Sequence, residues 1–134
     1  MARSQIVVLS EEEIFNIHEL VLQRDGGLPG LRMGASLSAT VERIYNHAHF
    51  DPDYRDPWRL SALWAYAIAV GHPFNDANKR TALTASVAML KCNAGSQPEP
   101  AALAEQLVAA AARKVGQEEF IGRFESLAKE RRSA

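Results

Sequence analysis

The chain has 134 residues, of which 47% are hydrophobic and 23% are charged, and its formal net charge at pH 7 is −1. The composition is typical of a globular protein, and the length suits one domain with its own hydrophobic core over residues 1–134. Because the net charge is close to zero, we expect no direct binding of nucleic acid. Cys92 is the only cysteine, which excludes an internal disulfide and a multi-cysteine zinc site; we expect it partly buried on a helix.

The N-terminal segment predicts a short apolar stretch followed by a helix. The run from Ile6 to Leu9 is compatible with a short strand but is too short for a signal peptide or a membrane span. We therefore expect a cytoplasmic protein without a membrane partner. Ser10 and Glu13 form a capping box, and apolar residues repeat at helical spacing from Ile14 to Val21. Gly26 and Gly27 predict the end of this helix, with an ordered loop over residues 26–30.

Two further helices precede a polar turn. One is predicted from Ser36 or Ser38 to about Phe50, and the prolines and acids that follow it break the helix. The next begins with Asp56 as N-cap and Pro57 as its first residue. We expect this third helix at the centre of the molecule, because it carries an apolar stripe at helical spacing. The stripe consists of Leu60, Leu63, Trp64, Ala67 and Ile68.

Three helices are predicted after the turn. The first runs from about Ala77 to a stop at Asn93-Ala94-Gly95. The second is alanine-rich, opens at Pro98-Glu99-Pro100 and runs to about Lys114, and the third follows Gly116. Their apolar positions are Leu83, Val87 and Leu90 in the first and Phe120, Phe124 and Leu127 in the last. The expected fold class is all-α, a compact bundle of about six helices.

The turn between the third and fourth helices holds the densest set of reactive groups. Residues 72–80 read His-Pro-Phe-Asn-Asp-Ala-Asn-Lys-Arg and lead into a helix N-terminus, where free N–H groups and the helix dipole favour a phosphate. Asp76 suits Mg²⁺, which takes one or two carboxylates together with substrate phosphates. His72 suits a base near neutral pH. The competing interpretation is a capped turn with solvated Lys79 and Arg80.

The same turn, extended to Thr81, resembles the signature of the Doc (death on curing) branch of the Fic/Doc family, the toxins of Phd–Doc toxin–antitoxin modules. The similarity extends with falling strength from about Val8 to Asn93 and includes the Gly-Gly-Leu-Pro-Gly sequence of residues 26–30. It implies an all-helical Fic fold, with one Fic/Doc-like domain over residues 1–134.

The resemblance also implies roles for individual residues. His72 would be the base that acts on a target hydroxyl, and Asp76 would bind Mg²⁺. The implied catalytic residues are His72, Asp76, Lys79 and Arg80, and the implied ATP-binding residues are Phe74, Asn75, Ala77, Asn78, Lys79 and Arg80. Phe74, the only large apolar residue of the turn, would point into the core and hold the turn in place. Residues 26–31 would lie near the edge where the target docks, although a plain interhelical loop explains them equally well.

Lys79 bears on which group is transferred. Fic enzymes that attach AMP resemble one another in a His-Pro-Phe-x-x-Gly-Asn-Gly-Arg-Thr-x-Arg pattern, whereas this chain has Ala77 and Lys79 at the two glycines and Leu83 at the last arginine. A glycine leaves room for a phosphate against the backbone, and Lys79 fills that room and adds a charge. Doc proteins share the lysine. This implies a reversed nucleotide and transfer of the γ-phosphate to a Ser/Thr hydroxyl, with elongation factor Tu as the implied target and growth arrest as the outcome.

Two alternatives to the kinase are transfer of AMP to a protein hydroxyl and a catalytically silent Doc-like module that acts with its antitoxin. Fic enzymes often carry an inhibitory Ser/Thr-x-x-x-Glu-Gly/Asn helix, but the near matches at residues 38–43 and 126–131 both end in arginine. We therefore expect inhibition by a separate Phd-like antitoxin, whose disordered C-terminal segment folds onto the site.

His18, His47 and His49 are interpreted as ordinary core or surface histidines, since residues two apart on a helix cannot share a ligand.

Overall fold

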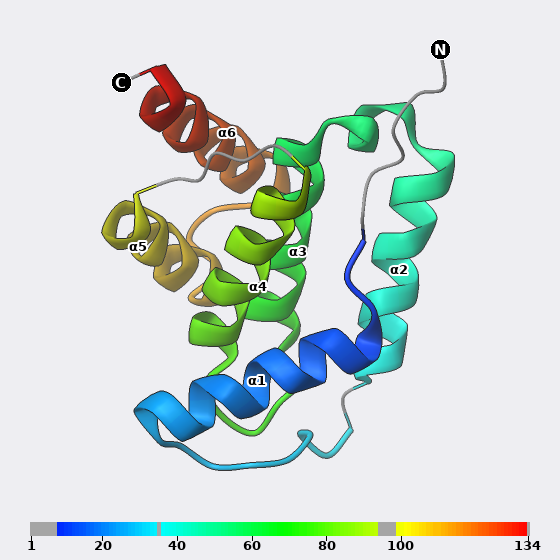
Figure 1. Cartoon of the computed structure of the whole chain (residues 1–134), viewed down its shortest axis with the longest axis vertical. Coiled ribbons are helices and arrows are strands. Elements are labelled where there is room, and N and C mark those ends of the chain that lie inside the picture. The colour runs from blue at the N-terminus through cyan, green and yellow to red at the C-terminus, as the bar shows by residue number, and fades with distance from the viewer. Residues whose placement is uncertain (1–7, 35, 94–98, 134) are drawn as a thin grey trace.

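The computed structural model describes residues 8–34, 36–93 and 99–133 of the chain. These residues form six α-helices and one 3₁₀ turn: α1 (Glu11–Asp25), α2 (Leu37–Phe50), η1 (Pro52–Arg55), α3 (Pro57–Gly71), α4 (Asn78–Asn93), α5 (Pro100–Ala111) and α6 (Gln117–Ser133). Figure 1 shows α3 and α4 side by side and antiparallel, with α2 on one side and α5 and α6 on the other. Helix α1 crosses the end of this bundle at which α3 passes into α4. The predicted all-α fold is confirmed.

The predicted helix starts are confirmed by their caps. The Ser10 side chain accepts a hydrogen bond from the Glu13 N–H, and the Glu13 carboxylate accepts one from the Ser10 N–H, which completes the capping box. Ser36 caps α2 through the Ala39 N–H, and Asp56 caps α3 through the Trp58 N–H, with a proline in the first turn of α3. Such caps satisfy N–H groups that have no partner within the helix.

Helix α3 is the centre of the hydrophobic core. All five residues of its predicted stripe are buried, and Trp64 and Ile68 have no exposed surface. Helix α4 packs against it chiefly through small residues, Ala82 and Ala85, together with Met89 and Leu90. Small side chains allow the two helix backbones to approach closely, so the turn that joins them is held at a fixed place at the end of the core.

Three expectations need correction. Val8 and Leu9 form no strand, because no described segment beside them is a strand with which they could pair. Leu9 instead packs into the core. Ile6 and Val7 lie outside the described residues. Helix α5 ends at Ala111, before the predicted Lys114, since Arg113 adopts a left-handed conformation (φ 60°) that a helix cannot contain. Cys92 is exposed rather than partly buried. Helix α4 ends at Asn93 as predicted, and the remainder of its predicted stop, Ala94 and Gly95, lies outside the described residues.

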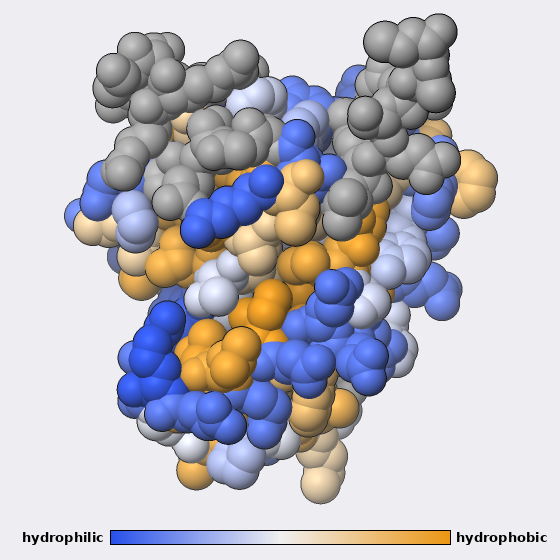
Figure 2. All heavy atoms as spheres, viewed as in Figure 1, coloured by the Kyte–Doolittle hydropathy of each residue, from blue (hydrophilic) through white to orange (hydrophobic). Residues whose placement is uncertain are grey.

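Figure 2, which has the same view as Figure 1, shows apolar surface over α1 and the neighbouring part of α4. A shallow groove between these two helices is lined by Leu20, Val21, Gln23, Arg24 and Thr84. Leu20 is 63% exposed, which is a large exposed fraction for a leucine on a packed helix. Within the described residues, none of the helices combines the length and the apolar character that crossing a membrane requires.

Candidate active site

The polar turn between α3 and α4 is bounded by two residues with left-handed backbone conformations. His72 ends α3 at φ 49° and ψ 58°, and Ala77 immediately precedes α4 at φ 64°. Left-handed conformations are unfavourable for residues with a Cβ, by about 1–2 kcal/mol each. The rest of the structure therefore has to hold this turn in its shape.

Two residues of the turn, Phe74 and Asn78, brace it from within. Phe74 is fully buried, as predicted. Its N–H donates to Asn78 Oδ1 (3.0 Å), and Asn78 Nδ2 donates to the Phe74 carbonyl (2.9 Å). Both polar atoms of the Asn78 side chain are thereby engaged. The resemblance assigns this side chain to a phosphate, and that role stays a prediction beside its hydrogen bonds to the Phe74 backbone.

A buried histidine supports the turn from α1. The ring of His18 is stacked on Phe74, and its Nε2 lies 2.9 Å from the Asp76 carbonyl oxygen. His18 has no exposed surface. Its interpretation as an ordinary histidine missed this contact, because nothing in the sequence relates a residue in the first helix to one 58 positions later.

The loop between α1 and α2 packs directly against the turn. Leu31 and Phe74 form an isolated antiparallel bridge, flanked by hydrogen bonds from the Asn75 N–H to the Gly30 carbonyl (3.0 Å) and from the Arg32 N–H to the Pro73 carbonyl (2.9 Å). The Asn75 side chain also donates to the Pro29 carbonyl (3.0 Å). The loop is therefore ordered, as predicted, and its backbone is part of the site.

Asp76 carries the carboxylate of the site, and backbone N–H groups hold it ionised. Leu28 N–H donates to Oδ2 (3.0 Å) and Ala77 N–H donates to Oδ1 (2.8 Å), and these two bonds lower the pKa of Asp76 below its ordinary value. Gly27 makes the first contact possible, because a Cβ there would lie 2.9 Å from Asp76 Oδ2 and 3.3 Å from Arg80 Nη2. Asp76 and Arg80 thus both lie close to the backbone of Gly27.

The two cations of the turn differ in their surroundings. Arg80 donates from Nη1 to the Gly26 carbonyl (3.1 Å) and lies 3.7 Å from the Asp25 carboxylate. Lys79 is exposed, and no ion pair joins it to another described residue. Both stand on the first turn of α4, where backbone N–H groups lack acceptors within the helix. Carboxylate, cations and helix end together suit a metal-bound phosphate chain.

The donor set also indicates how a metal would bind. The described residues contain no group of three histidine, cysteine, aspartate or glutamate side chains that could hold a metal ion. Asp76 alone therefore fits a Mg²⁺ ion that is shared with substrate phosphates, and does not fit an ion held by protein alone.

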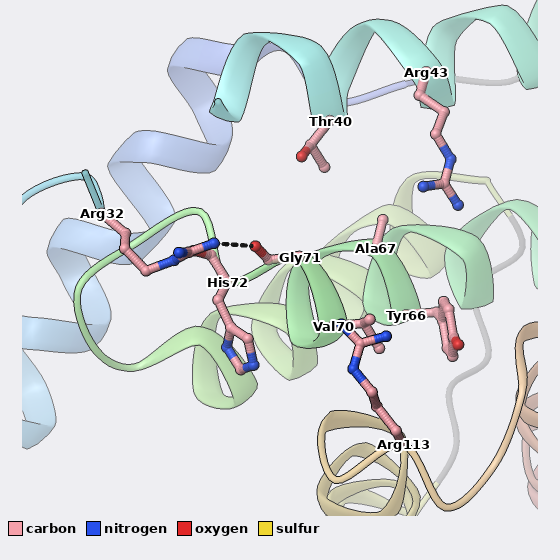
Figure 3. Close-up of a pocket in the computed structure, with 9 residues that line it drawn as sticks. All are labelled: Arg32, Thr40, Arg43, Tyr66, Ala67, Val70, Gly71, His72 and Arg113. Carbon is pink, nitrogen blue, oxygen red and sulfur yellow. Dashed lines mark hydrogen bonds between the residues drawn. The ribbon is translucent and has the colours of Figure 1, made fainter. Parts of the chain in front are cut away.

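His72 lines a cavity of about 460 Å³ (Figure 3). The cavity is lined by Arg32, Thr40, Arg43, Tyr66, Ala67, Val70, Gly71, His72 and Arg113. Partial burial lowers the pKa of His72 below its ordinary value, and the charges of Arg32, Lys79 and Arg113 lower it further. A neutral imidazole at pH 7 is what a base requires. Asp76 and Arg80 thus lie close to Gly27, and His72 lines the cavity.

The sequence of this chain is similar to known proteins over the region that contains the turn. Residues 8–90 match the family model described as Fic/DOC family. The chain belongs to the Fic/DOC family. A curated relative, "Protein kinase doc" from Escherichia phage P1, is 35% identical over 103 residues, which cover 77% of this chain and 81% of the relative. The region that matches the family model, residues 8–90, contains α1, the loop over residues 26–32 and the turn. It omits the connection between α5 and α6, which contributes Arg113 to the cavity.

Proposed function

We propose that this protein is a Doc-type toxin that acts as a protein kinase and transfers the γ-phosphate of ATP to a serine or threonine hydroxyl. The observation that carries the proposal is the turn itself. It combines a base with a lowered pKa, an ionised carboxylate beside an arginine, and a helix N-terminus that bears Lys79 where AMP-transferring relatives have glycine. The name of the phage P1 relative supports the choice of a kinase.

In the proposed reaction, His72 takes the proton of the acceptor hydroxyl. The hydroxyl oxygen forms a bond to the γ-phosphorus, the bond from that phosphorus to the β–γ bridging oxygen breaks, and ADP leaves. A base in this position is worth roughly 10²- to 10⁴-fold in rate. Most of the remaining acceleration in phosphoryl transfer comes from positioning and charge stabilisation.

Asp76 would hold Mg²⁺, which neutralises charge on the phosphates when bound. Arg80 and the exposed Lys79 would bind phosphate oxygens, together with free N–H groups at the start of α4. Arg80 is itself fixed by the Gly26 carbonyl and by Asp25, so its guanidinium is oriented before a nucleotide arrives. Lys79 lacks such contacts with described residues and is free to follow the phosphate.

Two protein partners belong to the proposal. Elongation factor Tu would be the phosphorylated target, and a Phd-like antitoxin would inhibit the enzyme. The exposed apolar groove between α1 and α4 supports an antitoxin partner, because a segment that folds on binding needs apolar surface to offset the entropy it loses. The groove lies on α1, whose buried face carries His18, so a bound segment would lie close to the turn.

The deciding experiment supplies ATP labelled at either the α- or the γ-phosphate, with Mg²⁺ and purified elongation factor Tu. We expect label to enter the target from the γ position, and His72→Ala to reduce transfer at least a hundredfold. His49→Ala, the same substitution at an exposed histidine of α2, is the matched control and should leave transfer unchanged.

Each other outcome has a defined meaning. Label that enters only from the α position would identify an AMP transferase, and no label from either position in a whole lysate would identify a silent binding module. Label that appears in other lysate proteins but not in elongation factor Tu would retain the kinase and reject the target.

A further inference from the structure

The cavity beside His72 gathers three arginines from separate parts of the chain (Figure 3). Arg32 follows α1, Arg43 belongs to α2, and Arg113 lies in the connection between α5 and α6. None of the nine residues that line the cavity is acidic. The cavity is therefore a concentrated positive site without a counter-charge in its wall, and its volume lies within the range of small-ligand sites.

The three arginines are not equivalent. Arg32 has a structural role, because its Nε donates to the His72 carbonyl (2.7 Å) and its Nη2 donates to the Gly71 carbonyl (3.1 Å). Arg43 Nη2 donates to the side chain of Gln117, which is uncharged (3.0 Å). Arg113 is exposed, and no hydrogen bond or ion pair of its side chain to another described residue is found. Arg43 and Arg113 therefore have guanidinium donors available for a ligand.

Backbone strain at Arg113 also supports a ligand site in the cavity. Its φ of 60° lies in the left-handed region, which is unfavourable for a side chain as large as arginine. The conformation ends α5 early and turns the chain back toward α3, where Arg113 reaches the cavity beside Tyr66 and Val70. Strain of this kind persists where the surrounding structure or a ligand site requires it.

The position of His72 indicates what enters the cavity. Among residues 72–80, His72 alone lines the cavity, whereas Asp76 and Arg80 both lie close to Gly27, which is not one of the lining residues. If phosphates occupy the Asp76 side, the acceptor hydroxyl reaches His72 from the cavity. We propose that the cavity is the acceptor subsite and binds a carboxylate side chain of the protein substrate next to the hydroxyl that is modified. Guanidinium groups suit this ligand, because they bind carboxylates in a planar, two-bonded geometry.

This inference rests on the proposed function for the acceptor, but carboxylate binding is measurable without catalysis. The full-length protein would be titrated, without ATP, with acetyl-Glu-Ser-Glu-amide and with the neutral acetyl-Gln-Ser-Gln-amide. The readout is the NMR signals of the Arg43 and Arg113 guanidinium groups and of the His72 imidazole. We expect shifts with the acidic peptide only, weakened by added salt because these charges are exposed. MgADP should leave the signals of Arg43 and Arg113 in place.

Variants complete the test. The double variant Arg43→Gln/Arg113→Gln should weaken binding of the acidic peptide about tenfold, because it removes two exposed charge pairs. Arg123→Gln is the matched control, because Arg123 is an exposed arginine of α6 outside the cavity. Arg32 is left unchanged, since it holds the end of α3.

Two results would overturn the inference. Equal binding of the acidic and neutral peptides would show that the cavity does not select carboxylates, and shifts of Arg43 and Arg113 with MgADP would assign it to the nucleotide. These results are distinct from failure of the proposed function. A protein that binds the acidic peptide but transfers no γ-phosphate would retain the carboxylate site and lose the kinase.

Discussion

The imidazole of His18 lies flat on the ring of Phe74, with ring centroids 3.7 Å apart and an interplanar angle of 5°. The Nε2–H of His18 donates to the Asp76 carbonyl (2.9 Å), because a carbonyl oxygen can only accept a hydrogen bond. One side chain of α1 thus fixes the apolar anchor of the turn and the residue that carries its carboxylate. A helix distant in sequence therefore supports the candidate site.

The first prediction separates stacking from hydrogen bonding at this position. His18→Phe keeps an aromatic ring against Phe74 but leaves the part-buried Asp76 carbonyl without its donor. We expect a loss of about 1–2 kcal/mol in the free energy of unfolding, measured by urea denaturation. His49→Phe on the exposed part of α2 should change it by no more than about 0.5 kcal/mol. Equal stabilities for the two variants would contradict the role of the hydrogen bond.

The second prediction concerns the close approach of Gly27 to Asp76. In Gly27→Ala the new Cβ would lie 2.9 Å from both Asp76 Oδ2 and Leu22 Cδ2, so the carboxylate must move away from the Leu28 N–H. We expect phosphate transfer to fall ten- to hundredfold, because small displacements of catalytic groups are costly.

Gly34→Ala is the control for this change. Gly34 also has a left-handed φ (82°, against 133° for Gly27), but nothing lies within 4 Å of a Cβ added there. Both variants carry backbone strain, and the Gly27 variant alone crowds the carboxylate. Similar activity of the two variants would show that the contact between Gly27 and Asp76 is unimportant.

The third prediction concerns Ala77, which occupies a left-handed conformation (φ 64°) immediately before α4. Ala77→Gly removes strain of about 1–2 kcal/mol, and this offsets the lost methyl group and the greater entropy of the unfolded chain. We expect a nearly unchanged free energy of unfolding. Ala85→Gly, at a fully buried position inside α4, should lower it by about 2 kcal/mol. Equal losses in the two variants would contradict the strained conformation of Ala77.

The fourth prediction follows from the lowered pKa of His72. A base must be neutral, so the acid limb of the pH–rate profile should lie below about pH 6.5, the ordinary value for histidine. Lys79→Gln removes a positive charge that disfavours protonation, so the pKa of His72 rises and the acid limb moves to higher pH. Lys91→Gln, in the last turn of the same helix, is the control and should leave the limb in place. A limb that does not move in Lys79→Gln would contradict the electrostatic contribution of Lys79.

The same shift has a consequence for stability. Because the folded state resists protonation of His72 more than the unfolded state does, the unfolded state binds more protons near pH 6. The contribution of this residue to stability is therefore present above about pH 6.5, the ordinary pKa of histidine, and is lost as pH falls through the lower pKa of the folded protein. His72→Gln should reduce the loss of stability between pH 7 and pH 5.

The sequence predicted the local features of the fold because they depend on neighbouring residues. The capping box of Ser10, the N-cap at Asp56 and the apolar stripe of α3 are all recorded within a few positions of the chain. The early end of α5 was missed, since alanine-rich sequence gives no sign of the left-handed conformation at Arg113.

The candidate site was predictable only where its residues are consecutive. The composition of residues 72–80 and their resemblance to the family signature indicated a phosphate-binding site. The burial of Phe74 followed from its being the only large apolar side chain there. The contact of His18 with Asp76, the hydrogen bond from Leu28, and the meeting of three arginines around His72 depend on how distant elements pack. The resemblance assigns the Asn78 side chain to a phosphate, whereas its hydrogen bonds to the Phe74 backbone could not be predicted from the sequence.

The antiparallel arrangement of α3 and α4 gives the turn an electrical polarity. His72 stands at the carboxyl end of α3, which is the negative pole of that helix, and residues 78–80 stand at the amino end of α4, which is a positive pole. An imidazole that gains a proton there is stabilised by one pole, and a phosphate is stabilised by the other. In the proposed reaction, the two helices would therefore favour a separation of charge along the path from acceptor hydroxyl to phosphate, before any side chain of a partner has contributed.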